Sequence, residues 1–77
     1  MNKDRRTRLS KIAEGLETLK DELEMVKDEE QDAYDSIEEH FPDSERLDAM
    51  SEAIDSMDSA QNDIETAIES IQEVIDA

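Results

Sequence analysis

The sequence predicts an all-α fold in which two helices pack as an antiparallel, coiled-coil-like hairpin. Apolar residues recur at steps of three and four along most of the 77 residues, and the single proline interrupts them near the middle. The chain also has only one glycine and no cysteine, which excludes disulfides and thiolate metal sites. We therefore expect residues 1–77 to form one helical-hairpin domain.

The first helix is expected over about residues 4–39. Its heptad places a at 9, 16, 23, 30 and 37, and d at 12, 19, 26, 33 and 40. Glu30 is the one charged residue that interrupts the a positions. Ala13, Tyr34 and Phe41 widen the apolar stripe at e.

A turn is expected over residues 40–44, because Pro42 disfavours helical geometry in the residue before it. Asp43 or Ser44 can cap the next helix, and Glu45 suits its first turn because the helix dipole favours negative charge there. A loop of this length is sufficient to reverse the chain direction between two helices.

The second helix is expected over about residues 45–76. Its a positions are 47, 54, 61, 68 and 75, and its d positions are 50, 57, 64 and 71. Alanines and Val74 recur at g, so the apolar stripe is wider than a two-stranded seam requires.

The two heptads match in an antiparallel hairpin when the numbers of paired residues sum to 87. A register that sums to 80 is also compatible with both heptads and stays open. In the first register, Val26 faces Gln61 and Glu30 faces Met57, so two polar residues lie in adjacent layers. They either fix register or oligomeric state, or face solvent where the helices splay.

Two helices leave much of each apolar stripe uncovered, and exposed apolar patches of that size mark interfaces. We therefore expect a homodimer in which two hairpins form an antiparallel four-helix bundle. The alternative is a lone hairpin with a thin seam. The predicted self-association residues are Leu16, Leu23, Ile54, Met57, Ile64, Ile68 and Ile71.

Charge is the second strong feature of the sequence, because 24 acids and 8 bases give a net charge of −16 and no base follows Arg46. Such a chain repels nucleic acid and anionic membranes, so neither is an expected partner. We expect instead a basic protein partner, such as a DNA-binding enzyme. Its predicted contacts are Asp48, Glu52, Asp55, Asp63, Glu69, Glu73, Asp28, Glu29 and Asp32.

No catalytic, cofactor-binding or metal-binding site is expected. Paired carboxylates perform acid–base chemistry only where a cleft shifts their pKa values, and a narrow hairpin offers no cleft. The acidic run near Asp28 lacks EF-hand spacing, and the chain has no Glu-x-x-His motif because Ile37 stands three residues before His40. The protein is therefore expected to be non-enzymatic.

Gly15, the only glycine, falls at a g position of the first helix. A glycine there costs about 1 kcal/mol against alanine. Two explanations stay open: close approach of the second helix, and contact with a partner.

The basic residues cluster at the N-terminus, at Lys3, Arg5, Arg6, Arg8 and Lys11. Alone, such a cluster is typical of a nucleic-acid arm. A hairpin favours another interpretation, since it places the cluster beside the acidic end of the second helix. We therefore expect charge pairing, within one chain or between subunits, with Glu69, Glu73 and Asp76.

Four short segments resemble one group of proteins, the small acidic proteins that bacterial phages and mobile elements encode, most of them without an assigned function. The segments are Arg5-Arg6, Asp28-Glu29-Glu30-Gln31, Asp43-Ser44-Glu45-Arg46 and Ala53-Ile54-Asp55. The resemblance implies a mobile-element setting, in which small acidic inhibitors of host defence occur. It carries over no functional residue.

We expect a cytoplasmic protein, in the host cytoplasm if phage-encoded, because no stretch approaches the roughly 18 apolar residues of a membrane span and no apolar region follows the basic N-terminus. The predicted function is inhibition of a host DNA-binding or defence enzyme by DNA mimicry. The alternative is a structural or assembly protein whose acidic face confers solubility. A small ligand held between subunits, with an anion near Arg5, Arg6 and Arg8, is a third possibility.

Overall fold

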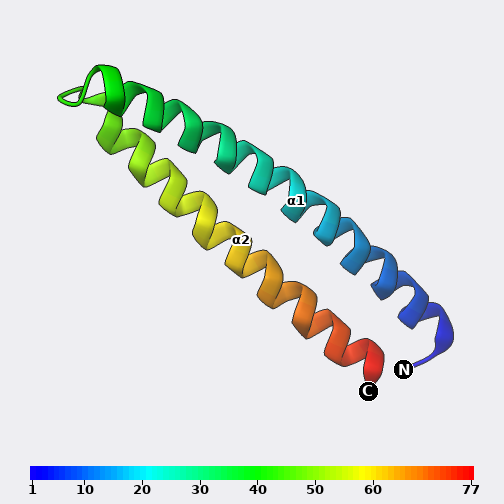
Figure 1. Cartoon of the computed structure of the whole chain (residues 1–77). Coiled ribbons are helices and arrows are strands. Elements are labelled where there is room, and N and C mark those ends of the chain that lie inside the picture. Colours follow the sequence, from blue (N-terminus) through cyan, green and yellow to red (C-terminus); the bar gives the residue numbers. More distant parts are fainter.

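The structure, a computed structural model, describes residues 1–77 and consists of two helices. Helix α1 spans Lys3–His40 and helix α2 spans Arg46–Asp76. The helices lie side by side in opposite directions, so the two termini meet at one end and the turn lies at the other (Figure 1). The Cα atoms fill a rod of 57 × 14 × 12 Å. The predicted all-α hairpin is confirmed, and each helix boundary lies within about one residue of its prediction.

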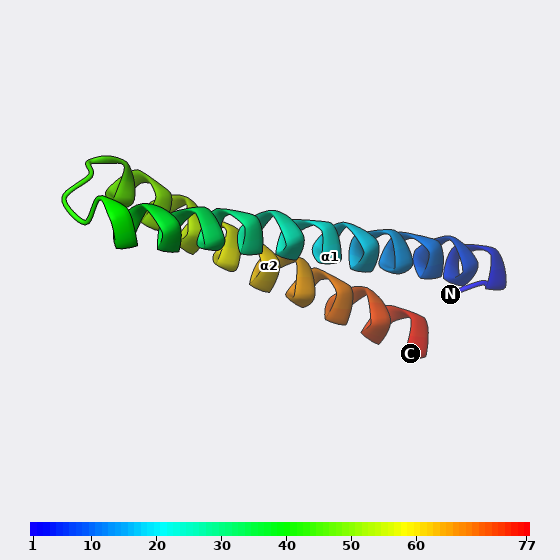
Figure 2. The ribbon, with the colours of Figure 1, turned by 45° about the horizontal axis from the view of Figure 1, so that its top comes forward.

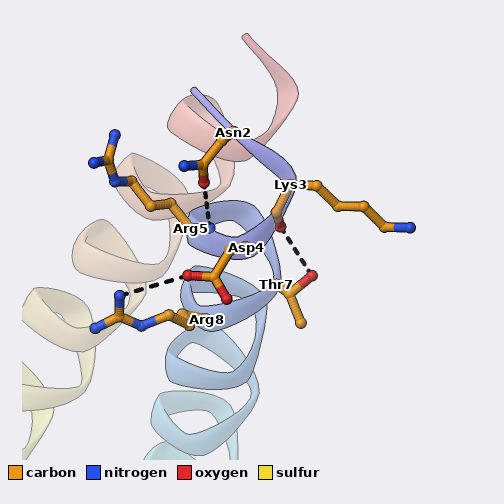
Figure 3. Close-up of polar contacts among 6 residues, drawn as sticks. All are labelled: Asn2, Lys3, Asp4, Arg5, Thr7 and Arg8. Atoms are coloured by element: carbon orange, nitrogen blue, oxygen red, sulfur yellow. Dashed lines mark hydrogen bonds and ion pairs between the residues drawn. The ribbon is translucent and has the colours of Figure 1, made fainter.

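Asn2 explains where α1 begins. Its side-chain Oδ1 accepts a hydrogen bond from the backbone N–H of Arg5 at 2.8 Å, and Asp4 lies in the first turn, where the helix dipole favours an acid (Figure 3). The cap satisfies one of the free N–H groups of the first turn. The helix therefore begins at Lys3.

Ser44 supplies the side chain that starts α2. Its Oγ accepts a hydrogen bond from the N–H of Arg46 at 3.2 Å, and its carbonyl accepts one from Leu47 at 3.2 Å. Glu45, which flanks the helix, makes no capping hydrogen bond through its side chain. At the other side of the turn, the N–H of Phe41 donates to Ile37 at 2.6 Å and closes α1. The N-cap residue is therefore Glu45 rather than the predicted Asp43 or Ser44, and Ser44 contributes its hydrogen bond from the position before the N-cap.

Helix α2 turns its a and d positions toward α1, as predicted. Leu47, Met50 and Gln61 are buried there, and the remaining a and d residues are half-buried. Only one residue of α1, Ala13, is buried to the same degree. The two helices cross at a shallow angle along this seam (Figure 2). The core is therefore thin, and most of it belongs to α2.

Helix α1 meets this seam through its a and e positions, so the predicted a/d face of the first helix is wrong. Ile12, Leu19 and Val26, all at d, are 51%, 56% and 51% exposed. The residues at e instead lie inward, with Lys20 and Lys27 half-buried beside Leu16 and Leu23 at a.

The two inter-helix ion pairs join e positions of both helices, and such pairs are compatible with both predicted registers, so the register stays a prediction. Lys20 pairs with Glu65, and the Lys27 Nζ atom lies 3.2 Å from Asp58 Oδ1. With α1 turned toward e, both ammonium groups reach acids of α2. Their aliphatic stems meanwhile cover apolar surface of the seam. The a positions of α1 remain in the seam whether d or e lies beside them. The rotation of α1 toward e therefore keeps half of its apolar stripe packed.

The two polar heptad residues both lie at the seam. Gln61 is 8% exposed and therefore lies in the contact between the helices, whereas Glu30 is half-buried at the edge of this contact. No fully buried side-chain nitrogen or oxygen lacks a hydrogen-bond partner. Gln61 therefore occupies an apolar layer without leaving a buried polar atom unpaired.

Candidate interaction surfaces

The nine acids predicted to contact a partner are all exposed, and none forms an ion pair. We refer to them as the acidic surface: Asp28, Glu29, Asp32, Asp48, Glu52, Asp55, Asp63, Glu69 and Glu73. The contact between Lys27 and Asp58 brings some of them to a similar level of the rod, because Asp28 to Asp32 follow Lys27 on α1, and Glu52 and Asp55 precede Asp58 on α2. The others are spread along α2 from Asp48 to Glu73.

Almost no positive charge interrupts this surface. After Lys11 the chain has three basic residues, and two of them, Lys20 and Lys27, are held in ion pairs at the seam. The hydrogen bond to Glu65, followed by the negative charge of that carboxylate, raises the pKa of Lys20 above its ordinary 10.5. Arg46 is the one base of this part that lies outside any ion pair.

No enclosed pocket accompanies the acids. The largest hollow, of 560 Å³, is an open depression at the turn, lined by Ile37, Phe41, Pro42, Asp43, Ser44 and Arg46. The Nδ1 atom of His40 lies 3.0 Å from the carbonyl oxygen of Ser36, within its own helix. No group of three His, Cys, Asp or Glu side chains is placed to hold a metal ion.

The basic end meets the other terminus differently from the prediction. The guanidinium of Arg6 donates a hydrogen bond to the backbone oxygen of Ala77 at 2.9 Å, and Arg8 lies 3.8 Å from Asp4 on its own helix. Arg5 and Arg8 extend to the same side of α1, and Lys3 extends to the other (Figure 3). None of these bases pairs with Glu69, Glu73 or Asp76.

The reason lies in the helix faces. Those acids occupy b and f positions of α2, which point away from α1, and no basic side chain of the chain pairs with them. The predicted pairing within a single hairpin is therefore wrong. Pairing between subunits stays a prediction.

The two sides of the hairpin differ in chemistry. Both inter-helix ion pairs use e positions of α1 and α2, so they lie on the same side. The d positions of α1 and the g positions of α2 therefore lie on the opposite side. The exposed apolar residues there are Ile12, Leu19, Val26, Ala33, Ala67 and Val74, and the exposed polar residues His40 and Arg46 lie at its turn end. We call this the apolar side.

The seven predicted self-association residues lie elsewhere. Leu16, Leu23, Ile54, Met57, Ile64, Ile68 and Ile71 are all half-buried, in the seam of the hairpin itself. Their packing inside one chain leaves the d residues of α1 as the larger uncovered apolar area. The sequence signal that distinguishes the two sets is the placement of Lys20 and Lys27 at e, where they can pair with acids of a neighbouring helix.

Gly15 lies on the apolar side, three residues after Ile12 and four before Leu19. A Cβ atom at this position would meet no atom within 4 Å. Close approach of α2 therefore does not explain the glycine, and the predicted intramolecular role is wrong. Contact with a partner remains as its explanation.

Comparisons with protein-family models, with curated proteins and with solved structures find no match to this chain. Neither helix is long and apolar enough to cross a lipid bilayer.

Proposed function

We propose that the chain is a non-enzymatic acidic protein that occupies the DNA-binding surface of a basic partner and keeps DNA out. One observation carries the proposal. Of the 23 acids after Lys11, only Glu65 and Asp58 form ion pairs. This leaves 21 carboxylates outside any ion pair, against one such base, Arg46. Solubility alone requires far less charge of a single sign than this.

The shape of the rod supports the same proposal. Its 57 Å length matches about 17 base-pair steps of a duplex at about 3.4 Å each. Along α2 the acids recur about every 5 Å of helix axis, compared with one phosphate per about 3.4 Å along one DNA strand. A positively charged channel that accepts a duplex therefore meets a rigid surface of similar length, with a charge density of the same order.

The mechanism is stoichiometric competition. Carboxylates on stiff helices replace phosphates against Lys and Arg of the partner, and no bond is made or broken. Because such contacts are electrostatic and exposed, they weaken as salt screens them. The proposal also includes the setting that the resemblance implies, a bacterial cytoplasm in which a phage or mobile-element protein blocks a host DNA-binding or defence enzyme.

The test begins with capture of the partner. The protein is immobilised and exposed to nuclease-treated bacterial lysate at low salt, and bound proteins are eluted at about 0.5 M salt. We expect a basic, DNA-binding protein that elutes with salt. Added hairpin should then displace a labelled duplex from the purified partner in a fixed molar ratio. A partner that stays bound at high salt, or a duplex that is not displaced, would contradict DNA mimicry.

Matched variants locate the contact. Asp55→Asn, Asp63→Asn and Glu69→Gln together keep side-chain size and remove three charges, and we expect at least tenfold weaker displacement. The control combines Ser51→Ala, Ser59→Ala and Ser70→Ala, three exposed positions of the same helix without charge. Circular dichroism confirms that both sets stay helical. Equal displacement by both sets would show that the acids of α2 are not the contact.

An assembly protein is the second candidate, and the exposed apolar side favours it. A chain that only needed solubility and a seam would leave fewer large apolar residues in solvent than Ile12, Leu19, Val26 and Met25, which are all more than half exposed. In this case the acids keep a self-associating rod soluble. Elution as an oligomer in gel filtration would favour this candidate, as would a capture experiment that recovers no DNA-binding partner.

A further inference from the structure

The apolar side of α1 carries an ordered sequence of exposed side chains. Along one face, at steps of three and four, stand Arg5, Arg8, Ile12, Gly15, Leu19, Glu22, Val26 and Glu29. Each of these residues is exposed. The face is therefore basic at one end and acidic at the other, and Glu22 is the one charged residue among the apolar residues and glycine of its middle part.

The central part of this face has the features of a helix–helix contact. Ile12, Leu19 and Val26 repeat every seven residues and are 51%, 56% and 51% exposed. Gly15 stands between the first two, with open space where a Cβ would be. A glycine at that point lets a second helix backbone come close, and nothing within the chain uses that space.

The charges at its two ends indicate what covers it. Arg8 lies 11 residues before Leu19 and Glu29 lies 10 residues after it. On a helix the two side chains therefore stand about 16 Å and about 15 Å from Leu19, on opposite sides. A second copy of the same face, turned by a two-fold axis near Leu19, brings each Arg8 level with Glu29 of the other copy. Arg5 comes level with Asp32 in the same way.

We infer that a second copy of this chain covers the apolar side, α1 on α1 and antiparallel, with Leu19 at the two-fold axis. The turn of each hairpin then lies toward the termini of the other. A parallel arrangement of α1 on α1 would place Arg8 level with Arg8 and Glu29 level with Glu29 of the other copy, so like charges would meet. The charge pattern therefore selects the antiparallel arrangement.

This interface is separate from most of the acidic surface. Asp48, Glu52, Asp55, Glu69 and Glu73 occupy b and f positions of α2, which face away from the apolar side. The dimer therefore presents these acids twice on one longer assembly. The inference does not depend on the proposed function, since a dimer can form whether or not a basic partner reads the acids.

The test is the mass of the protein in solution across a dilution series, measured by light scattering and sedimentation. We expect the wild-type chain to reach twice its 8.8 kDa mass, and Leu19→Glu to stay at 8.8 kDa with unchanged helicity. The control is Phe41→Glu, which changes a still more exposed apolar residue outside the face and should leave the dimer intact. A monomeric wild type at about 1 mM, or a Leu19→Glu dimer, would overturn the inference.

Two further variants test the geometry. Gly15→Ala should raise the melting temperature of the dilute monomer, because alanine favours helix and meets no atom there, yet weaken dimerisation at least tenfold. Arg8→Glu should weaken the dimer, and adding Glu29→Arg should restore it at unchanged net charge. The antiparallel interface would be refuted if Gly15→Ala left the dimer dissociation constant unchanged. It would also be refuted if Glu29→Arg did not restore the dimer in the Arg8→Glu variant.

Discussion

The two helices carry equally regular apolar heptads, yet the hairpin uses them differently. Helix α2 turns a and d inward and buries Leu47 and Met50. Helix α1 turns a and e inward and leaves Ile12 and Leu19 in solvent. The difference comes from the bases. Helix α1 has two lysines at e beside its apolar stripe, and α2 has Asp58 and Glu65 at its own e positions, so the hairpin pairs them on one side.

This contrast shows how few residues can choose a helix face. Exposed ion pairs contribute little, typically about 0.2–1 kcal/mol each. Both arrangements keep the a positions packed, however, so they differ mainly in whether d or e flanks them. A small electrostatic preference can then decide which apolar residues stay outside. In a chain whose own core is thin, that choice also determines the surface left for a partner.

The largest expected effect compares one leucine from each helix. Leu47→Ala removes a buried side chain and should lower the free energy of unfolding by about 2 kcal/mol. Leu19→Ala, at an exposed position, should change it by less than about 0.5 kcal/mol in the dilute monomer. Urea denaturation at low protein concentration measures both. Equal losses would show that α1 does pack through its d positions.

A smaller gain is expected at the polar layer of α2. Gln61→Leu keeps a similar volume and removes the cost of enclosing an amide at the seam, so it should stabilise the hairpin by about 1 kcal/mol. Gln72→Leu is the control, because Gln72 is exposed and should respond little. If Gln61→Leu instead destabilises the chain, the amide stabilises the hairpin by fixing the register of the two helices, and the seam is not a purely apolar contact.

The inter-helix ion pairs should contribute less still. A double-mutant cycle with Lys27→Met and Asp58→Asn should give a coupling of about 0.5 kcal/mol that shrinks in high salt. The Arg8–Asp4 pair, whose side chains are 73% and 77% exposed, should couple more weakly. A coupling near zero at Lys27 would remove the proposed cause of the different helix faces.

The smallest effect is a change in alkaline titration. Glu38, as hydrogen-bond partner and then as a nearby charge, raises the pKa of Tyr34 above its ordinary 10.0. Tyr34 is the only tyrosine and the chain has no tryptophan, so near-ultraviolet absorbance follows it directly. We expect a midpoint above 10.0, and Glu38→Gln should move it back toward that value.

The sign of the linked stability follows from these pKa values. Tyr34 in its neutral form and Lys20 in its charged form are both favoured by folding, so each has a raised pKa in the folded state. Their contribution is complete below the unfolded pKa values and is lost as pH rises through the raised ones. Denaturation at pH 9 and pH 11 should therefore show the loss only on the alkaline side, and no loss there would contradict both assignments.

Much of the fold follows from the sequence because its signals are local. Heptad spacing, Pro42 and Ser44 determine helix, turn and helix without long-range information. Asn2 is equally local and could have been identified as the cap of α1 from its residue type. Each helix boundary was consequently predictable to about one residue.

The face of α1 was not predictable from spacing alone. Positions d and e lie on either side of a. When both carry side chains with apolar parts, hydrophobicity alone does not determine which of the two packs against α2. The deciding contacts, Lys20 with Glu65 and Lys27 with Asp58, join residues 45 and 31 positions apart. The exposure of the acids was predictable for the opposite reason, since isolated charged residues rarely become buried.

The position of the two termini has a mechanical consequence. Both lie at one end of the rod, with the turn at the other (Figure 1). A force applied between the termini opens the hairpin as a zipper, and its layers break one after another toward Leu47 and Met50 beside the turn. A force applied between one terminus and the turn runs along a single helix instead, so the seam carries almost none of it. The seam is therefore broken by one pulling direction and left almost unloaded by the other.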